Sequence, residues 1–229
     1  MNKKNKRIFF IIPAYNEGKS IGRVVRELKK AGYSNIVVID DGSTDNTFSE
    51  AKKQNIFALQ HIINRGQGAS LKTGIDFALR QGADILVTFD SDGQHRVEDL
   101  PAMLKPVMDG EVDVTLGSRF LKKTDMPFGR RILLKGSVVV QWIFYGVKLS
   151  DAHNGFRVLS RKAAQRIEID ADRMEHASEI LEEIVRKKIE FREVPVIIRY
   201  TGYSMQKGHG SFLGAVKILA KMIIRKFID

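Results

Sequence analysis

The sequence of 229 residues contains no cysteine and only one tryptophan. Without cysteine, neither a disulfide framework nor a cysteine-based zinc site can form, and a reducing compartment such as the cytoplasm fits this composition. Long hydrophobic runs are scarce as well. The first apolar run, residues 8–12, is too short for a signal-peptide core. The longest one, residues 132–147, is shorter than the roughly 20 residues of a spanning helix. We therefore expect neither a signal-peptide core nor a membrane span.

Positive charge is in excess, with a formal net charge of +11. Such a surplus favours an anionic partner: nucleic acid, an anionic membrane or a phosphorylated substrate. The basic residues concentrate in residues 117–149 and 205–229, and both segments are also apolar. Within residues 212–228, apolar side chains at helical spacing alternate with lysine and arginine. This pattern is typical of a helix lying on a membrane surface, so we expect an anionic membrane surface rather than nucleic acid as the partner.

Short apolar runs alternate with helical patterns along much of the chain. We expect strands at residues 8–12, 36–39, 57–63, 85–89, 112–116 and 194–198. Periodicity predicts helices at residues 19–31, 44–54, 69–81, 97–109 and 176–188. This alternation predicts an α/β fold with a mostly parallel, Rossmann-like sheet and helices on both faces. Ligands of such sheets bind at the carboxyl ends of the strands.

No internal repeat, low-complexity tract or linker divides the chain. The economical division is one main domain over residues 1–204 and a basic amphipathic extension over residues 205–229. We expect the extension to form C-terminal amphipathic helices that contact either a membrane interface or another subunit.

The most informative motif is Asp90-Ser91-Asp92-Gly93-Gln94, which follows the strand expected at residues 85–89. Two carboxylates one residue apart at a strand end can converge on Mg²⁺ or Mn²⁺, hard cations that prefer oxygen ligands and often bridge to substrate phosphates. Aspartate and glycine after a strand can equally form a plain turn, so the motif alone leaves both interpretations open.

Two further polar motifs follow the first two expected strands. In Pro13-Ala14-Tyr15-Asn16-Glu17, a tyrosine followed by polar groups could bracket a base and its ribose. In Asp40-Asp41-Gly42-Ser43-Thr44-Asp45, Asp41 could accept hydrogen bonds from a base or ribose, whereas Thr44 or Asp45 could cap the next helix. Read alone, each motif is also compatible with an ordinary turn.

Together and in this order, the three motifs resemble the family 2 inverting glycosyltransferases of the GT-A fold, over about residues 8–120. Later segments resemble the polyprenyl- or dolichyl-phosphate sugar transferase branch, which includes dolichol-phosphate mannosyltransferases and short bacterial undecaprenyl-phosphate forms. These segments are Gly117-Ser118-Arg119-Phe120, Gly129-Arg130-Arg131-Ile132, Asp151-Ala152-His153-Asn154-Gly155-Phe156-Arg157 and Arg199-Tyr200-Thr201-Gly202-Tyr203-Ser204.

The resemblance implies metal-dependent, inverting transfer of a hexose or N-acetylhexosamine from a nucleotide diphosphate sugar, with UDP favoured, to polyprenyl phosphate. It implies that Asp90, Asp92 and Gln94 hold Mg²⁺ or Mn²⁺. The residues implied to bind the nucleotide sugar are Pro13, Ala14, Tyr15, Glu17, Asp41, Ser91, Arg199, Ser204 and Lys207. The implied catalytic set is Asp92 with Arg119, Arg130 and Arg131, the three arginines approaching the acceptor phosphate.

This chemistry needs cations more than a base. The leaving nucleoside diphosphate develops charge that a metal ion, arginine or lysine can stabilise. A lipid phosphate is already an anion and can attack the sugar without a strong general base. Arginine supplies forked donors that suit phosphate, and the basic residues between 117 and 135 fit that need. The resemblance also implies peripheral placement on the cytoplasmic face of the membrane, a small membrane protein as partner, and a homo-oligomer.

Two other functions compete. A family 2 enzyme that acts on a saccharide hydroxyl would need a carboxylate base, for which Asp151, Glu175 and Glu179 are the candidates. A basic nucleic-acid-binding protein would show a steep salt dependence, but no RNA-stacking aromatic signature is present in the sequence.

The remaining candidates lie outside the three motifs. Residues 64–66 follow the strand expected at 57–63 and either line the donor pocket or form a plain loop. We expect His95 and His153 near the site, and His176 and His209 in structural roles.

Overall fold

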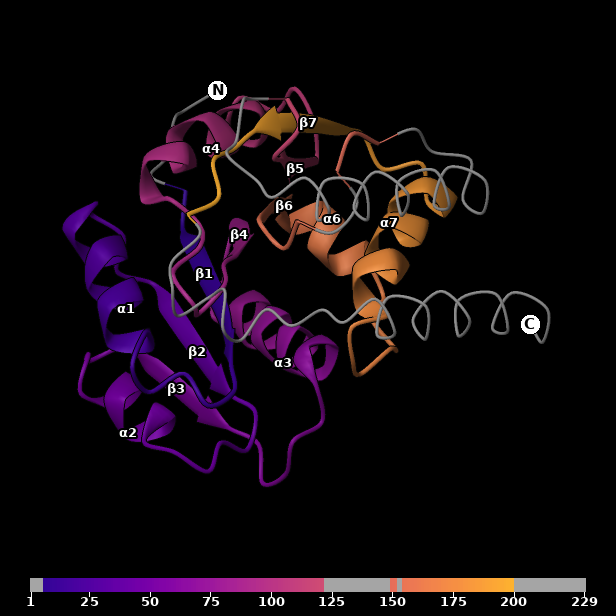
Figure 1. The fold of residues 1–229 in the computed structure, drawn as a ribbon. Coiled ribbons are helices and arrows are strands. Elements are labelled where there is room, and N and C mark those ends of the chain that lie inside the picture. Colours follow the sequence, from indigo (N-terminus) through magenta and orange to yellow (C-terminus); the bar gives the residue numbers. More distant parts are fainter. Residues whose placement is uncertain (1–5, 122–148, 152–153, 200–229) are drawn as a thin grey trace.

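The computed structural model describes residues 6–121, 149–151 and 154–199 (Figure 1). The segments at 132–147 and 212–228 and the proposed extension at 205–229 lie outside the described residues, so their predicted helices and roles stay predictions. In the part that is described, no helix is both long enough and apolar enough to cross a membrane.

The described chain alternates strands and helices over most of its length. The strands are β1 (Ile8–Ala14), β2 (Ile36–Asp40), β3 (Phe57–Gln60), β4 (Ile85–Thr88), β5 (Val114–Ser118), β6 (Arg157–Ser160) and β7 (Phe191–Pro195). The helices are α1 (Ile21–Lys30), α2 (Thr47–Lys52), α3 (Gln67–Arg80), α4 (Leu100–Met108, after the short 3₁₀ turn η1, Val97–Asp99), α6 (Arg161–Arg166) and α7 (His176–Arg186).

The strands form one seven-stranded sheet in the order β3-β2-β1-β4-β6-β5-β7. The pairs β1–β2, β2–β3, β1–β4 and β5–β7 are parallel, whereas β6 runs antiparallel to both β4 and β5. The predicted α/β class with a mostly parallel sheet is therefore confirmed. The sequence pattern missed β6, because its four residues begin with an arginine and show no clear apolar period. The strand expected at 194–198 begins earlier, at Phe191, and the one expected at 112–116 begins later, at Val114.

Helices cover both faces of the sheet, as predicted (Figure 1). Successive side chains of a strand point to opposite faces. Phe9 and Ile11 of β1 belong to the core cluster that contains residues of α3, α6 and α7, whereas Phe10 and Ile12 belong to the cluster with residues of α1, α2 and α4. All four side chains are fully buried. A continuous apolar run of this kind is typical of a parallel strand covered on both faces.

The parallel strands β1, β2 and β4 end at the same edge of the sheet. Ala14 at the end of β1 pairs with Asp40 at the end of β2, and Ile11 of β1 pairs with Thr88 at the end of β4. The three polar motifs follow directly after these strand ends and are therefore brought together, although they lie up to about 80 residues apart in the sequence.

Candidate active site

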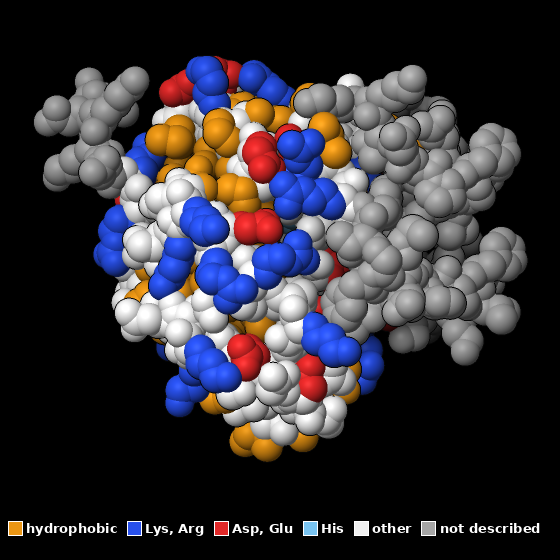
Figure 2. All heavy atoms as spheres, turned by 60° about the vertical axis from the view of Figure 1, so that its left-hand side comes forward, with side chains coloured by type: hydrophobic (Ala, Val, Ile, Leu, Met, Phe, Trp, Pro, Cys, Tyr) orange, Lys and Arg blue, Asp and Glu red, His pale blue; other side chains and the backbone are white. Residues whose placement is uncertain are grey.

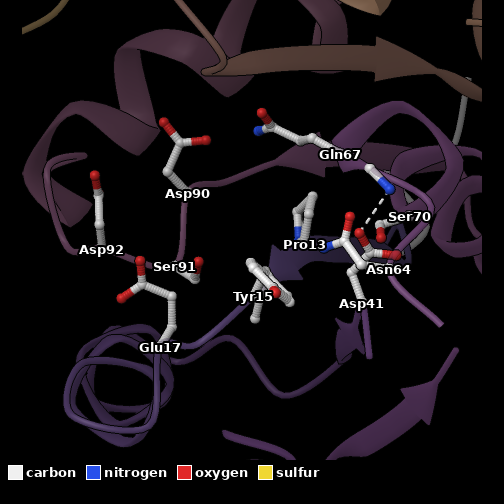
Figure 3. Close-up of a pocket in the computed structure, with 12 residues that line it drawn as sticks. Pro13, Tyr15, Glu17, Asp41, Asn64, Gln67, Ser70, Asp90, Ser91 and Asp92 are labelled. Atoms are coloured by element: carbon white, nitrogen blue, oxygen red, sulfur yellow. Dashed lines mark hydrogen bonds between the residues drawn. The ribbon is translucent and has the colours of Figure 1, made fainter. Parts of the chain in front are cut away.

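A cavity of about 340 Å³ opens where the three motifs meet. Its walls come from the ends of β1, β2 and β4 with the loops that follow them, from the loop between β3 and α3, and from the start of α3. The lining residues are Pro13, Ala14, Tyr15, Glu17, Asp41, Asn64, Gly66, Gln67, Ser70, Asp90, Ser91 and Asp92. Figure 3 shows Asp90, Asp92 and Glu17 on one side of this pocket and Asp41, Asn64 and Ser70 on the other, with Pro13 and Tyr15 between them.

Asp41 is buried at the end of β2 and its carboxylate accepts several hydrogen bonds. The backbone N–H of Gly66 donates to Oδ2 at 2.7 Å and that of Arg65 to Oδ1 at 3.1 Å. The ring of His61 reaches Oδ1 through Nδ1 at 2.8 Å, and its Nε2 lies 3.0 Å from the hydroxyl of Thr73 on α3. These contacts fix the direction of the Asp41 carboxylate.

Gly66 permits the sharp entry into α3. Its φ of +115° lies in the region that favours glycine, and a Cβ there would come within 2.4 Å of the carbonyl oxygen of Asp172. Asp172 in turn accepts the backbone N–H of Ala69 at 3.0 Å. The loop of residues 61–66 is thus packed between Asp41 and Asp172. This packing holds the backbone N–H groups of Arg65 and Gly66 against the Asp41 carboxylate.

The loops after β1 and β2 are tied to each other. The backbone N–H of Asn16 donates to the Ser43 hydroxyl, and the Asn16 side chain accepts the backbone N–H of Thr44, each at 2.9 Å. The N-cap residue of α2 is Asn46, so neither Thr44 nor Asp45 holds the N-cap position expected for them. Asp45 still accepts the N–H of Thr47, the first residue of α2, at 2.9 Å. Tyr15 lines the pocket and is 45% exposed.

The opposite wall concentrates negative charge. Burial, together with the charges of Asp90 and Glu17, raises the pKa of Asp92 to about 7, although hydrogen bonds from Gln94 act in the other direction. The backbone N–H of Gln94 donates to Asp92 Oδ1 at 2.9 Å and its side-chain amide to Oδ2 at 2.6 Å. Gln94 therefore orients Asp92 in this structure. Its implied role as a metal ligand stays a prediction.

A hard divalent cation needs carboxylate donors, and its charge would relieve the repulsion that raises the pKa of Asp92. Asp90 and Asp92 fit this requirement. No cluster of three or more histidine, aspartate or glutamate side chains arranged around one metal position occurs within the described ranges. Further ligands would then come from amide or substrate oxygens, as magnesium sites commonly use phosphate and water.

Asp90 rests on the segment Asn154-Gly155-Phe156-Arg157. A Cβ on Gly155 would lie 2.9 Å from Asp90 Oδ1, so only glycine lets the carboxylate approach this closely. Arg157 is buried under the site and donates to the carbonyl oxygen of Ala177 at 3.1 Å. Burial lowers the pKa of Arg157 to about 10 against the opposing charges of Asp90 and Asp151, so its guanidinium is still charged at neutral pH.

Two histidines show the effect of burial. Desolvation lowers the pKa of His95 against the opposing charge of Asp90, with help from the charge of Arg119. Desolvation also lowers the pKa of His176 to about 4, with help from the charge of Arg157. The His95 ring is next to Asp90, which confirms its expected place near the site. His176 begins α7 and its Nδ1 contacts the carbonyl oxygen of Arg173 at 2.6 Å.

Arg119 was expected to approach the acceptor phosphate, and the structure places it in a buried pair with Asp151. Nε and Nη2 each lie 2.7 Å from a different carboxylate oxygen of Asp151, whose Oδ2 also accepts the backbone N–H of Arg119 at 3.0 Å. This forked geometry engages both partners. A direct role of Arg119 on the acceptor stays a prediction, and the structure adds a structural role for it.

The other implied substrate arginine that is described, Arg199, faces acidic side chains of α1 and η1. Its guanidinium lies 3.1 Å from both carboxylate oxygens of Glu98 and 3.4 Å from Glu27. Its backbone N–H donates to the carbonyl oxygen of Gln94 at 2.9 Å, which ties it to the Asp92 loop. Four other candidates lie outside the described residues: Arg130, Arg131, Ser204 and Lys207, as does His153.

The candidate bases for hydroxyl acceptors have structural partners. Asp151 is paired with Arg119, and Glu179 accepts the backbone N–H groups of Asp170 and Ala171 at 3.2 and 2.9 Å. These bonds hold the loop that packs against the start of α3. Glu175 directly precedes α7.

Sequence reasoning missed three pocket-side residues. Gln67 and Ser70 line the cavity from α3, and the Ser70 hydroxyl is fully buried with no hydrogen-bond partner among the described residues. His61 supports Asp41 from behind. The signal available was position, because all three lie just after the end of β3. Asn64 and Gly66 line the pocket, as one of the two interpretations expected.

The model of glycosyl transferase family 2 matches residues 9–168, and the chain belongs to this family. An uncharacterized protein of Methanocaldococcus jannaschii is 41% identical over 99% of this chain and 95% of its own. The UDP-N-acetylglucosamine–dolichyl-phosphate N-acetylglucosaminyltransferase of Methanococcus voltae is 34% identical over 97% of each chain. The polyprenol monophosphomannose synthase of Mycolicibacterium smegmatis is 30% identical over 74% of this chain and 67% of its own.

Among solved structures, glucosyl-3-phosphoglycerate synthase from Mycobacterium tuberculosis, in complex with Mn²⁺, uridine diphosphate and glucosyl-3-phosphoglycerate, superposes with a TM-score of 0.69. The match covers 96% of this chain and 80% of that one at 16% identity, which shows a shared fold. The predicted family, the GT-A fold and the glycosyltransferase class are therefore confirmed.

Proposed function

We propose that this glycosyltransferase transfers a sugar with inversion from a nucleotide diphosphate donor to polyprenyl phosphate, with the help of Mg²⁺ or Mn²⁺. One observation carries the proposal: a fixed carboxylate, Asp41, and a charge-dense pair, Asp90 and Asp92, face each other across one cavity. The first suits a nucleoside, which offers N–H and O–H donors. The second suits the cation that accompanies a diphosphate.

We assign each group of side chains to a different part of the donor. Asp41 accepts hydrogen bonds from the base or ribose, and the exposed ring of Tyr15 packs against the nucleoside, with Pro13, Ala14, Glu17 and Ser91 completing the wall. Asp90 and Asp92 hold the metal ion, with Gln94 either orienting Asp92 or joining them as a ligand. When bound, the ion neutralises charge developing on the leaving diphosphate. Ser204, Lys207 and Arg199 approach that diphosphate.

The acceptor phosphate needs cations that hold it near a second anion. We assign this role to Arg130 and Arg131, whereas Arg119 is held in its buried pair with Asp151. Because a lipid phosphate is ionised, no general base is required. The buried pairing of Asp151 with Arg119 and the backbone contacts of Glu179 favour this acceptor over a saccharide hydroxyl, the second candidate function.

The Methanococcus voltae relative, named for UDP-N-acetylglucosamine and dolichyl phosphate, supports UDP-N-acetylhexosamine as the donor. Relatives named as mannose transferases support a hexose instead. The deciding experiment incubates the protein with polyprenyl phosphate, Mg²⁺ or Mn²⁺ and a panel of nucleotide sugars, and identifies the lipid product by mass spectrometry. Product that forms equally well in EDTA would contradict the metal role. Product that forms only on a saccharide would establish the second candidate function.

A bilayer-embedded acceptor requires a membrane-facing site, so we place the protein peripherally on the cytoplasmic face, where a small membrane protein or a second copy of the chain would add contacts. Figure 2 shows lysine and arginine side chains spread, with acidic ones between them, over the side that carries α1 and α2. The basic residues of the 205–229 extension would add roughly 1 kcal/mol each near an anionic leaflet. Replacing Lys217, Lys221, Arg225 and Lys226 with Gln should release the protein from anionic vesicles in a flotation assay. Unchanged flotation would place the membrane contact elsewhere.

A further inference from the structure

The two walls of the pocket have one feature in common: a histidine stands behind the carboxylate. An aspartate side chain turns freely about two bonds unless other groups hold it, and binding sites work best when their contact atoms are held in advance. Asp41 and Asp90 come from different strands and face different parts of the cavity. Whatever fixes each one therefore acts on a different part of the bound substrate.

His95 holds Asp90 at two points. The backbone N–H of Asp90 donates to His95 Nδ1 at 3.1 Å. Since this nitrogen accepts, the ring proton of the neutral imidazole is on Nε2, which lies 3.1 Å from Oδ2 of the same aspartate. The ring itself is held between two phenylalanines, stacked on Phe156 at 5.0 Å and edge-on to Phe89 at 5.1 Å. Because the buried ring contacts both the backbone and the carboxylate of Asp90, it restricts the orientation of the Asp90 side chain.

His61 holds Asp41 in a different way. An ionised carboxylate only accepts hydrogen bonds, so Nδ1 of His61 donates to Asp41 Oδ1 at 2.8 Å. Nε2 is then the acceptor for the hydroxyl of Thr73 at 3.0 Å. The imidazole connects the end of β2 to α3, and its side chain is only 12% exposed.

We propose that His95 and His61 are positioning residues that act separately, His95 on the metal-binding carboxylate Asp90 and His61 on the nucleoside-binding carboxylate Asp41. The assignment rests on the proposed function for what each carboxylate binds. Neither histidine lines the cavity, so both act through their aspartates. The two supports share no residue, which predicts that each can be removed without loosening the other wall.

Four variants test this division. His95→Leu keeps an apolar side chain between the phenylalanines and removes both contacts to Asp90, whereas His95→Gln offers an amide acceptor and donor in their place. His61→Leu removes both contacts of His61. His61→Asn restores a donor near the position of Nδ1 but cannot reach Thr73. Thermal melting of all four identifies any variant that is simply unfolded.

Two binding titrations measure the metal-binding wall and the nucleoside-binding wall separately, without relying on turnover. Mn²⁺ binding is followed by electron paramagnetic resonance at saturating UDP, and UDP binding by calorimetry at saturating Mn²⁺. We expect His95→Leu to weaken Mn²⁺ binding by roughly tenfold or more, as loss of outer-shell support commonly does, with UDP affinity changed by less than about twofold and His95→Gln intermediate. We expect His61→Leu to weaken UDP binding roughly tenfold, the loss of one hydrogen bond to a charged group, with Mn²⁺ binding unchanged and His61→Asn partly restored.

Each histidine variant is expected to weaken one ligand and spare the other, and this pattern separates the inference from the function on which it rests. If the wild-type protein binds neither Mn²⁺ nor UDP, the proposed function fails and the inference fails with it. If the wild type binds both and folded His95→Leu binds Mn²⁺ normally, the function stands and His95 is not a positioning residue. If folded His95→Leu and His61→Leu each weaken both ligands equally, the two supports are not separate and the inference is wrong.

Discussion

The two walls of the pocket differ in their electrostatics. On the nucleoside side, the Asp41 carboxylate is satisfied: two backbone N–H groups and a histidine point at it. On the metal side, Asp92 is half-buried, and this burial together with the charges of Asp90 and Glu17 raises its pKa to about 7. The first wall is complete without a ligand, whereas the second contains repulsion that a cation would relieve. Preformed hydrogen bonds suit an uncharged base, and stored negative charge suits a metal ion.

The largest expected effect comes from Asp92→Asn, which tests the metal wall. Loss of a Lewis acid removes several kcal/mol of transition-state stabilisation, so turnover should fall roughly a thousandfold or more. The metal-free variant should be at least as stable as wild type, because it removes a half-buried carboxylate that neighbouring negative charges repel. Turnover assays and chemical denaturation in EDTA measure the two quantities. A variant that is both active and less stable would reverse the interpretation of this wall.

Arg119→Ala tests the buried pair of Arg119 with Asp151. It would leave the buried Asp151 carboxylate without its forked partner, which typically costs about 3–5 kcal/mol of unfolding free energy. Urea unfolding measures that loss. The double variant Arg119→Met/Asp151→Leu should recover much of it, since it buries no unpaired charge. Unchanged stability with a raised Michaelis constant for polyprenyl phosphate would instead support the direct acceptor role.

His176, the buried first residue of α7, should make stability depend on pH. Its pKa is about 4 in the folded protein against about 6.5 in an unfolded chain, so the unfolded chain binds the proton first as pH falls. The stabilisation is fully present above about pH 6.5 and is lost toward pH 4, by about 3 kcal/mol at most. His176→Gln should flatten this part of the profile. Denaturation at pH 7 and pH 4.5 gives the difference, and parallel losses in both proteins would exclude His176 as the source.

Asp41→Asn should give the smallest effect and completes the comparison. Both carboxylate oxygens of Asp41 now accept backbone N–H groups, from Gly66 and Arg65. In the asparagine variant, the amide nitrogen would replace one of these oxygens and could not accept. Loss of hydrogen bonds to a charged group commonly costs about 1.5–3 kcal/mol, so UDP affinity should fall roughly ten- to a hundredfold while the Mn²⁺ requirement stays the same. Calorimetry with UDP at saturating Mn²⁺ tests the first expectation. A changed Mn²⁺ requirement would show that the walls are coupled.

Particular residues show what could be foreseen. The three motifs could be placed in one pocket from sequence because they follow buried apolar runs, and parallel strands end at one edge. Asp41, Asp90, Asp92 and Tyr15 line that pocket as expected. Strand β6 could not be foreseen, because four residues carry too little periodicity and their pairing with β4 and β5 depends on residues about 40 to 70 positions away.

The sequence by itself determined the family, the fold class and the carboxylates that face the pocket, because local apolar runs and short polar motifs encode them. Only the tertiary structure decided what stands behind those carboxylates. It paired Arg119 with Asp151 across 32 positions of sequence, set His95 against Phe156 and linked His61 to Thr73. A side chain's partner is chosen by burial and distance in the folded chain, and an arginine or histidine has no sequence pattern that distinguishes a substrate contact from a buried support.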